Sequence, residues 1–173
     1  MLETVENGSL ANLWGVEINW QQNFTFLPGF LSGFGVYANY TYTNSDASIM
    51  RGDNPEVLTE EDISLPGQAD HLFNFALNFT KGKFQGRLAA MYNGSFISNL
   101  AQTADQDEIS DDRLQLDFSA SYGLNDNFRI FTEVINITDA PVRFYQGVRS
   151  RPTFQEFYSW WARVGLKFNL AQY

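Results

Sequence analysis

Residues 14–43 read WGVEINWQQNFTFLPGFLSGFGVYANYTYT, and this stretch decides the fold class. Apolar and aromatic residues occupy most even positions on both sides of the central LPGF sequence. Gly, Asn, Gln, Glu and Thr fill most of the odd positions. A period of two is that of a β-strand with one apolar and one polar face. Because Pro-Gly favours a tight reversal, the stretch predicts a hairpin of two long strands, residues 14–26 and 34–42.

The same alternation returns along the rest of the chain. Further strands are expected at residues 71–80, 84–96, 114–122, from 128 onward, and 158–170. Short turns (KGK at 81–83 and NDN at 125–127) alternate with long polar segments at 44–68, 98–112 and 139–156. No helical period and no domain linker interrupt this order. The sequence therefore predicts an all-β chain of about seven long antiparallel strands.

Strand length separates a membrane barrel from a soluble sheet. Strands of soluble proteins usually have about 5–6 residues, whereas strands that cross a bilayer need about 9–11. The predicted strands are about 9 to 13 residues long, and aromatic residues gather near their ends. Aromatic girdles at both interfaces and alternating turn lengths are typical of outer-membrane barrels. We therefore expect a transmembrane β-barrel with its polar face toward the lumen, and keep a soluble β-sandwich as the alternative.

Composition narrows the function. The 173 residues carry a net charge of −9, no cysteine, one histidine, 16% aromatic and 18% charged residues. These values argue against disulfides, Cys- or His-based metal sites and nucleic-acid binding. No apolar run has the roughly 18 residues of a membrane helix, and residues 1–12 do not resemble a signal peptide. No nucleophile, acid–base pair or phosphate loop is recognisable, so we expect neither an enzyme nor a cofactor.

An odd number of strands cannot form a closed single-chain barrel of this kind. Open strand edges in lipid leave backbone groups unsatisfied, and bacterial single-chain barrels have even strand numbers. A start at Met1 without a leader indicates a cytoplasmic protein or a piece of something larger, and the strand pattern favours the piece. If the chain ends in the periplasm, the first and last strands run in the same direction. The expectation is the last part of a larger barrel.

Four Asn-x-Thr sequons, at residues 23–25, 39–41, 78–80 and 136–138, admit a second explanation besides glycan attachment. In the first three, alternation places Asn and Thr on the lumen face and the aromatic residue on the lipid face. The predicted lumen residues are Asn23, Thr25, Asn39, Thr41, Asn78 and Thr80, and the predicted lipid residues are Phe24, Tyr40 and Phe79. The phase of Asn136 and Thr138 is ambiguous, because apolar residues fall on both faces of that strand. The triplets indicate strands near a bilayer boundary.

The few charges on the predicted lumen face are expected to pair across strands. They are Glu17, Arg87, Arg113, Asp117, Arg129, Glu133, Arg163 and Lys167. Counting from the turn at residue 126 and from the chain end places Glu133 and Arg163 at similar height on neighbouring strands. We predict that these two side chains face each other.

Other candidate sites lie near strand ends or in the long segments. His71 and Trp160 are predicted at a membrane interface, and Trp161 on the opposite face from Trp160. The acidic run DQDEISDD, residues 105–112, lacks the glycine and ligand spacing of an EF-hand, which favours a solvated charged segment over a calcium site. In YQGVRSR, residues 145–151, arginines could hold an anionic ligand or contact lipopolysaccharide. No ligand-binding, catalytic or metal residue is assigned.

Several segments resemble one family in order and spacing. They are LWGVEI (13–18), LPGF (27–30), ANYTYT (38–43), LPGQADHLFNFAL (65–77), LQLDFSASY (114–122), FTEVINITDAP (131–141) and FYSWWARVGLKF (157–168). Together they resemble the C-terminal barrel of TonB-dependent outer-membrane receptors. The resemblance implies a barrel of about 22 strands around an N-terminal plug domain. It also implies import of a siderophore, haem, vitamin or glycan across the outer membrane, driven by TonB.

On this resemblance, residues 1–173 are the C-terminal portion of the barrel, without the plug. The implied partners are outer-membrane lipids and lipopolysaccharide, the rest of the barrel and the plug, TonB through the plug region, and the imported ligand. Such barrels commonly end in an aromatic residue, and Tyr173 is aromatic but out of phase with the last strand. A smaller autonomous barrel, such as an adhesin or a lipid-modifying enzyme, remains the alternative membrane protein.

Overall fold

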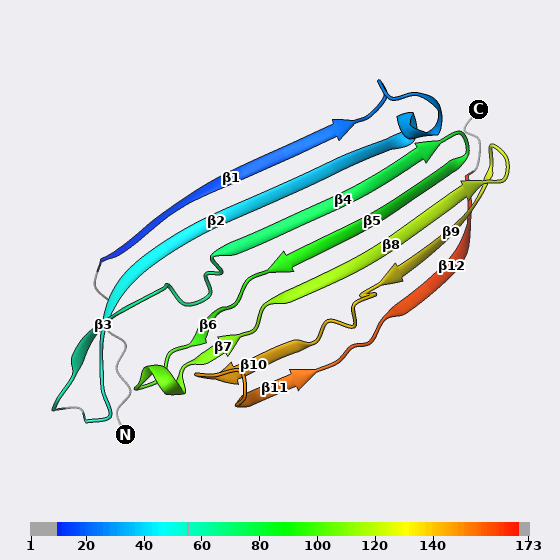
Figure 1. Ribbon diagram of the computed structural model, residues 1–173. Coiled ribbons are helices and arrows are strands. Elements are labelled where there is room, and N and C mark those ends of the chain that lie inside the picture. The colour runs from blue at the N-terminus through cyan, green and yellow to red at the C-terminus, as the bar shows by residue number, and fades with distance from the viewer. Residues whose placement is uncertain (1–9, 55, 170–173) are drawn as a thin grey trace.

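A long curved sheet dominates the structure, a computed structural model that describes residues 10–54 and 56–169 (Figure 1). Seven long strands follow one another in the order β1-β2-β4-β5-β8-β9-β12, and all are antiparallel. Their bounds are Ala11–Asn23, Phe34–Arg51, His71–Lys81, Phe84–Asn93, Arg113–Gly123, Phe128–Ile135 and Trp161–Phe168. The predicted seven-stranded all-β architecture is therefore confirmed.

Short connections join the long strands at one end, which we call the tight-turn end. A 3-10 turn η1 (Gly29–Gly33) lies between β1 and β2, and two-residue and four-residue turns follow β4 and β8. The first predicted strand is too long, since Phe24–Leu27 forms a turn in which the Leu27 amide donates to the Phe24 carbonyl at 2.9 Å. Thr25 and Phe26 therefore lie in this turn rather than on a strand face.

The opposite end, here the far end, contains strands where long loops were expected. β6 (Phe96–Asn99), β7 (Glu108–Ser110), β10 (Val142–Gln146) and β11 (Pro152–Glu156) form a second sheet in the order β11-β10-β7-β6. A short turn η2 (Ala104–Gln106) connects β6 and β7. The order repeats that of β12, β9, β8 and β5, so these strands continue the long hairpins after short breaks (Figure 1). The loop prediction for residues 98–112 and 139–156 was wrong to this extent.

The segment 44–68 also contains more strand than expected. β2 continues to Arg51, and its pairing with β1 reaches as far as Ala47. From Ala47 to Arg51, β2 pairs with β3 (Thr59–Ile63). The polar residues of this region lack the apolar face from which strands were recognised. The physical reason is that strands outside the bilayer need no lipid-facing side.

The sheet is a single layer with little core. Among the described residues no large side chain is fully buried, and the buried apolar residues are few: Val36, Ile63, Ala69, Ala76, Ala140 and Tyr145. By contrast, Val164 is 71% exposed and Trp14 is 55% exposed. A soluble β-sandwich would cover these side chains with a second sheet about 10 Å away. The architecture rules out the sandwich alternative.

Contacts between strands confirm the two predicted faces. On the apolar face the rings of Trp14 and Tyr42 lie 5.4 Å apart, and Tyr40 Oη lies 2.8 Å from His71 Nδ1. On the polar face the Asn39 amide donates to Glu17 at 2.8 Å and to Asn19 at 2.7 Å. The sequon around Tyr40 therefore alternates between faces as predicted, with Asn39 bound in a polar network.

Candidate functional site: a basic wall on the polar face

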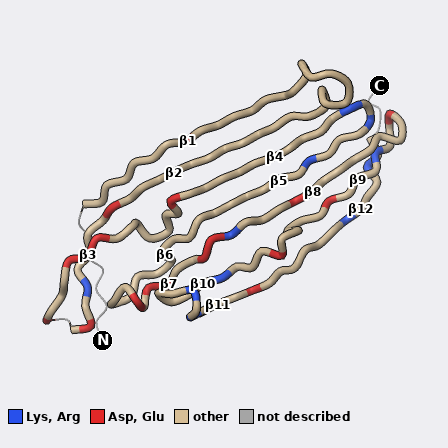
Figure 2. Tube along the Cα trace, in the orientation of Figure 1, with Lys and Arg blue, Asp and Glu red and all other residues tan. Residues whose placement is uncertain are grey.

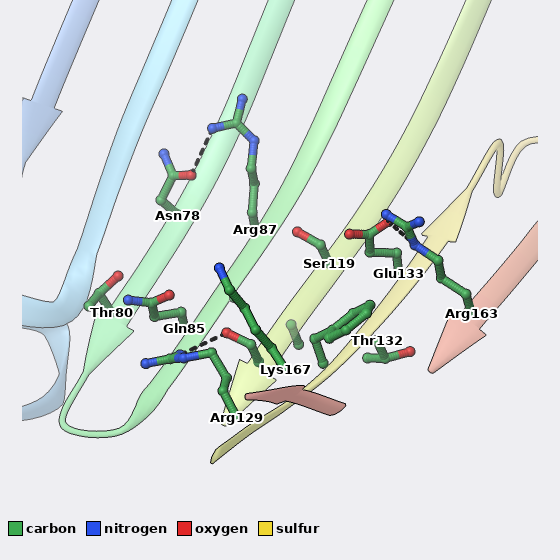
Figure 3. A pocket seen from close by; sticks show the side chains of 14 residues that line it. Asn78, Thr80, Gln85, Arg87, Ser119, Arg129, Thr132, Glu133, Arg163 and Lys167 are labelled. Atoms are coloured by element: carbon green, nitrogen blue, oxygen red, sulfur yellow. Dashed lines mark hydrogen bonds and ion pairs between the residues drawn. The ribbon is translucent and has the colours of Figure 1, made fainter. Parts of the chain in front are cut away.

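The polar face is hollowed near the tight-turn end. The hollow has a volume of about 690 Å³ and extends across β4, β5, β8, β9 and β12 (Figure 3). Its side chains are mostly polar or cationic: Asn78, Thr80, Gln85, Arg87, Ser119, Ser121, Arg129, Phe131, Thr132, Glu133, Arg163 and Lys167. We call this surface the basic wall, because its charges are four cations and one carboxylate.

One row of the basic wall runs straight across four strands. Arg87 lies opposite Ser119, Ser119 opposite Glu133, and Glu133 opposite Arg163. Arg163 donates through Nε to Glu133 Oε2 at 2.7 Å, and its second nitrogen lies 2.6 Å from the same oxygen (Figure 3). The predicted pairing of Glu133 with Arg163 is confirmed.

A second row, beyond the row of Phe131 and Gly165, brings two cations together. Arg129 on β9 is directly opposite Lys167 on β12. Arg129 donates to Ser121 Oγ at 2.9 Å, and Lys167 makes no hydrogen bond or ion pair within the described residues. In an antiparallel pair, setting Glu133 against Arg163 also sets Arg129 against Lys167, so the sequence carried the signal for this juxtaposition. We did not predict it, because each charge was expected to lie opposite a charge of the other sign.

The remaining charges of the polar face bind neutral groups rather than charges of opposite sign. Arg87 donates to Asn78 Oδ1 at 3.1 Å, and Arg113 donates to Gln115 Oε1 at 2.9 Å. Asp117 accepts from the Gln115 amide at 2.9 Å. The expectation of general pairing across strands is thus met by one pair among the described residues.

Phe131 is an aromatic residue on this polar face, and Gly165 explains its position. A Cβ atom at Gly165 would lie 2.5 Å from Phe131 Cζ, so the ring covers the glycine of the neighbouring strand. The Arg163 guanidinium lies 5.8 Å from the centre of the same ring, within cation–π range. The ambiguous phase of the sixth predicted strand therefore has a packing cause.

At the far end, the acidic segment 105–112 is tied to arginines. Arg51 is 6% exposed and Asp107 4%, and one Arg51 nitrogen donates to both Asp107 oxygens at 2.9 and 2.8 Å. The other side of the Arg51 guanidinium donates to Glu61 at 2.6 and 2.5 Å. These bonds raise the pKa of Arg51, with Glu61 as the first cause, and lower the pKa of Glu61. The expected solvated segment is instead partly buried and paired.

Asp107 also joins three far-end segments. Its side chain binds Arg51 at the end of β2, and its main-chain carbonyl accepts from Gly147 N at 2.9 Å. Gly147 has φ +65°, and a Cβ there would lie 2.3 Å from the Asp105 carbonyl oxygen. This close approach requires glycine. The far end is thus held as one unit around Asp107.

The arginines of residues 143–151 differ in their surroundings. Arg143 binds Asp111 at 2.6 Å, and Arg149 binds Asp111 at 3.1 Å and also Asp112. A hydrogen bond with Tyr145, followed by the two carboxylates, raises the pKa of Arg149. Two of the three arginines in this region are therefore engaged by the acidic segment.

Sequence reasoning left the phase of Asn136 ambiguous and did not predict that this residue closes the turn after β9. It has φ 57° and is 4% exposed. Its amide nitrogen donates to the Ser159 carbonyl at 3.1 Å, and its side-chain oxygen accepts from Ala140 N at 3.0 Å. Asn is one of the few residues that readily adopt this left-handed conformation. A buried amide that is hydrogen-bonded through both its nitrogen and its oxygen explains this sequon without a glycan.

The predicted positions of His71, Trp160 and Trp161 can be compared with the structure. His71 begins β4 and stacks on Tyr40 of the apolar face with ring centres 6.1 Å apart, and its place at a membrane interface stays a prediction. Trp160 lies just before β12, and Trp161 lies 5.9 Å from the Arg163 guanidinium, on the polar face. Tyr173 lies outside the described residues.

Neither a metal cluster nor a membrane helix is found in the described part of the chain. No group of three His, Cys, Asp or Glu side chains there is arranged to hold a metal ion. No helix within residues 10–54 and 56–169 has the length and apolarity needed to span a membrane.

The fold and its faces define a class, the wall of a membrane β-barrel. A sheet of seven long strands has one exposed aromatic face and one polar, hollowed face. Residues 3–137 match the family described as TonB dependent receptor-like, beta-barrel, which is more than half of the chain. The chain belongs to this family of outer-membrane receptors, which act in transport. Searches of curated proteins and of solved structures give no match.

Proposed function

We propose that the chain supplies the C-terminal strands of a larger receptor that imports a ligand through the outer membrane with energy from TonB. The family match carries this proposal. The alternating faces support it, because the apolar side suits lipid and the polar side suits a lumen. In this assignment the chain takes part in transport and catalyses no reaction.

The two outer strands support a larger barrel. Within the described residues β1 pairs with β2 alone and β12 with β9 alone, so both sheet edges present unpaired backbone groups. In lipid each such group would cost several kcal/mol, on the order of the cost of an unmade hydrogen bond. The remaining strands of the receptor would pair with both edges, and a plug domain would occupy the lumen.

Orientation follows from the two ends. The tight-turn end suits the periplasm and the far end suits the cell surface, because outer-membrane barrels have short periplasmic turns and longer extracellular segments. Lipopolysaccharide would surround the far end, near Tyr158 and Trp160. Since Arg143 and Arg149 bind Asp111, Arg151 is the arginine of this region we assign to an anionic group of the imported ligand.

The imported ligand belongs to one of four classes: a ferric siderophore, haem, a vitamin or a glycan. The test is uptake of a labelled member of each class by native cells, by cells lacking the receptor and by cells lacking TonB. We expect one class to accumulate in native cells alone. Equal accumulation without TonB would contradict the proposed coupling, and absence of the receptor from the outer-membrane fraction would contradict the assignment as a whole.

A further inference from the structure

A second, smaller hollow lies on the apolar face, on the other side of the sheet from the basic wall. It has a volume of about 190 Å³. We call it the outer hollow. Most of its lining residues have the phase of the exposed aromatic face: Phe84, Ala120, Tyr122, Ile130, Thr132 and Val164. The outer hollow therefore opens on the side of the sheet that suits lipid.

The register explains why the apolar face is hollowed at this place. Gly86, Ala120 and Thr132 lie side by side on β5, β8 and β9. The rows on either side of them carry larger side chains: Phe84, Tyr122 and Ile130 toward the tight-turn end, and Leu88, Phe118 and Val134 toward the far end. A Cβ atom at Gly86 would lie 3.2 Å from the Phe84 ring, so this ring leans over the glycine. A row of smaller residues between two rows of larger ones forms a groove.

The occupant of the groove has to come from outside the described residues. Within them the sheet is a single layer, and Val164 at the edge of the hollow is 71% exposed. An engineered apolar cavity of about 150 Å³ holds benzene, so the outer hollow has room for a short stretch of hydrocarbon. In lipid, contacts form through close packing, and a chain in a groove packs on more sides than a chain on a flat wall. An acyl chain of a membrane lipid fits this surface.

Polar groups at the tight-turn side of the outer hollow suit the head of the same lipid. Tyr122 lines the hollow, and its hydroxyl makes no hydrogen bond within the described residues. Lys83 directly precedes Phe84, and its Nζ donates to the Leu124 carbonyl at 3.2 Å. An ammonium group has three donors, so the exposed Lys83 amine can also bind a phosphate oxygen. The apolar groove therefore has a cation at the end nearest the turns.

We propose that the outer hollow is a binding site for one phospholipid. An acyl chain lies over Ala120, the phosphate binds Lys83, and the Tyr122 hydroxyl donates to the polar part of the lipid. The inference rests on the proposed function, which places the apolar face in the bilayer and the tight-turn end on the periplasmic side. The leaflet on that side of an outer membrane consists of phospholipid, whereas lipopolysaccharide occupies the other leaflet.

Lipid retention by the purified intact receptor tests the site. The receptor is incubated in detergent with phosphatidylglycerol, washed, and analysed by native mass spectrometry. In Ala120→Phe the ring fills the groove, so the most tightly held phosphatidylglycerol should be retained at least about fivefold less than in the wild type. Ala90→Phe adds the same ring to the same face of β5 outside the outer hollow and should retain lipid as the wild type does.

The head and the chain of the lipid can be tested separately. Lys83→Gln leaves the groove intact and should lower the retention of phosphatidylglycerol but not that of uncharged diacylglycerol. Phosphatidylglycerol with a diazirine on its acyl chain should label residues 118–122 and 130–134 of the wild type in vesicles. The same label should be lost in Ala120→Phe and kept in Ala90→Phe. Added lipopolysaccharide should not displace the phospholipid.

The outcomes separate this site from the proposed function. Equal retention and labelling of Ala120→Phe and the wild type would overturn the site. Unchanged retention in Lys83→Gln would also overturn it, as would displacement by lipopolysaccharide, which would place the hollow in the other leaflet. A receptor that stays monodisperse without detergent and does not enter vesicles would instead contradict the proposed function.

Discussion

The two ends of the sheet treat charge differently. At the far end, acidic side chains and arginines neutralise one another, as in the buried pair of Arg51 with Asp107. At the tight-turn end Arg163 binds Glu133, but the other cations of the basic wall bind neutral oxygens or stand opposite each other. Figure 2 shows the uneven distribution, with acidic residues concentrated toward the far end.

The two ends thus differ in whether a cation has a carboxylate partner among the described residues. The Asp107 carboxylate accepts hydrogen bonds from the Arg51 guanidinium and from the Ala101 main-chain amide. It therefore stabilises the far end through contacts within the chain. Lys167 has no bond of this kind within the described residues. Substitutions should therefore loosen the far end by removing a bond, whereas at the tight-turn end they should change the repulsion between opposed cations.

Breaking the buried pair should have the largest effect. Arg51→Met leaves the Asp107 carboxylate buried without its ion partner, which typically costs about 3–5 kcal/mol. We expect faster amide hydrogen exchange and proteolysis in residues 96–110, while the long strands keep their protection. Arg151→Met, which removes an exposed arginine of the same end, is the control. Unchanged exchange in Arg51→Met would show that the far end is held by other contacts.

Filling the space above Gly165 should have the next largest effect. Gly165→Val forces Phe131 away from its place, since even a Cβ would lie 2.5 Å from the ring. Overpacking of this kind costs about 1–3 kcal/mol. Urea unfolding of the receptor in lipid should show this loss, and Phe131→Ala in the same chain should restore part of it. Equal stability of Gly165→Val and the wild type would mean that the ring moves without cost.

Reversing one charge of the basic wall should stabilise the sheet slightly. Lys167→Glu places a carboxylate opposite Arg129 in place of a second cation, so the free energy of unfolding should rise by up to about 1 kcal/mol. Urea unfolding of the receptor in lipid measures this gain. Equal stability of Lys167→Glu and the wild type would mean that Arg129 and Lys167 do not repel each other.

Acid should weaken the exposed side of the Arg51 cluster, with the smallest effect. The hydrogen bond from Arg51 lowers the pKa of Glu61 below its ordinary value of 4.5. This contribution is present above that value and is lost as pH falls through the lower folded pKa. Proteolysis of residues 59–63 should therefore increase more between pH 7 and pH 3 in the wild type than in Glu61→Gln. Identical pH profiles would exclude this pair as the cause.

The long strands could be predicted because, in a membrane barrel, side chains alternate between the lipid and the lumen along each strand. One face of each strand must be apolar, which identified seven strands and set Glu133 opposite Arg163. Beyond the bilayer this requirement ends. The far-end strands and the extension of β2 to Arg51 were therefore invisible, although they continue the same hairpins.

The candidate site was predictable in its parts and less so in its arrangement. Each cation of the basic wall was placed on the lumen face from alternation alone. Their grouping depends on register, and the cover of Phe131 over Gly165 becomes visible only when β9 and β12 are aligned. Arg51 and Asp107 are 56 positions apart in the sequence, in a region without periodicity, so no local pattern predicts their pairing.

The strand order has a consequence for assembly. Every long strand pairs with the next long strand along the chain, so the pairing of these strands needs no distant segment of the chain. A newly formed hairpin already satisfies the hydrogen bonds between its two strands and leaves open only its outer edges. The wall can therefore grow, or change in evolution, by one hairpin at a time. Adding or deleting a hairpin would alter the barrel circumference by about 10 Å and leave the register of the other pairs intact.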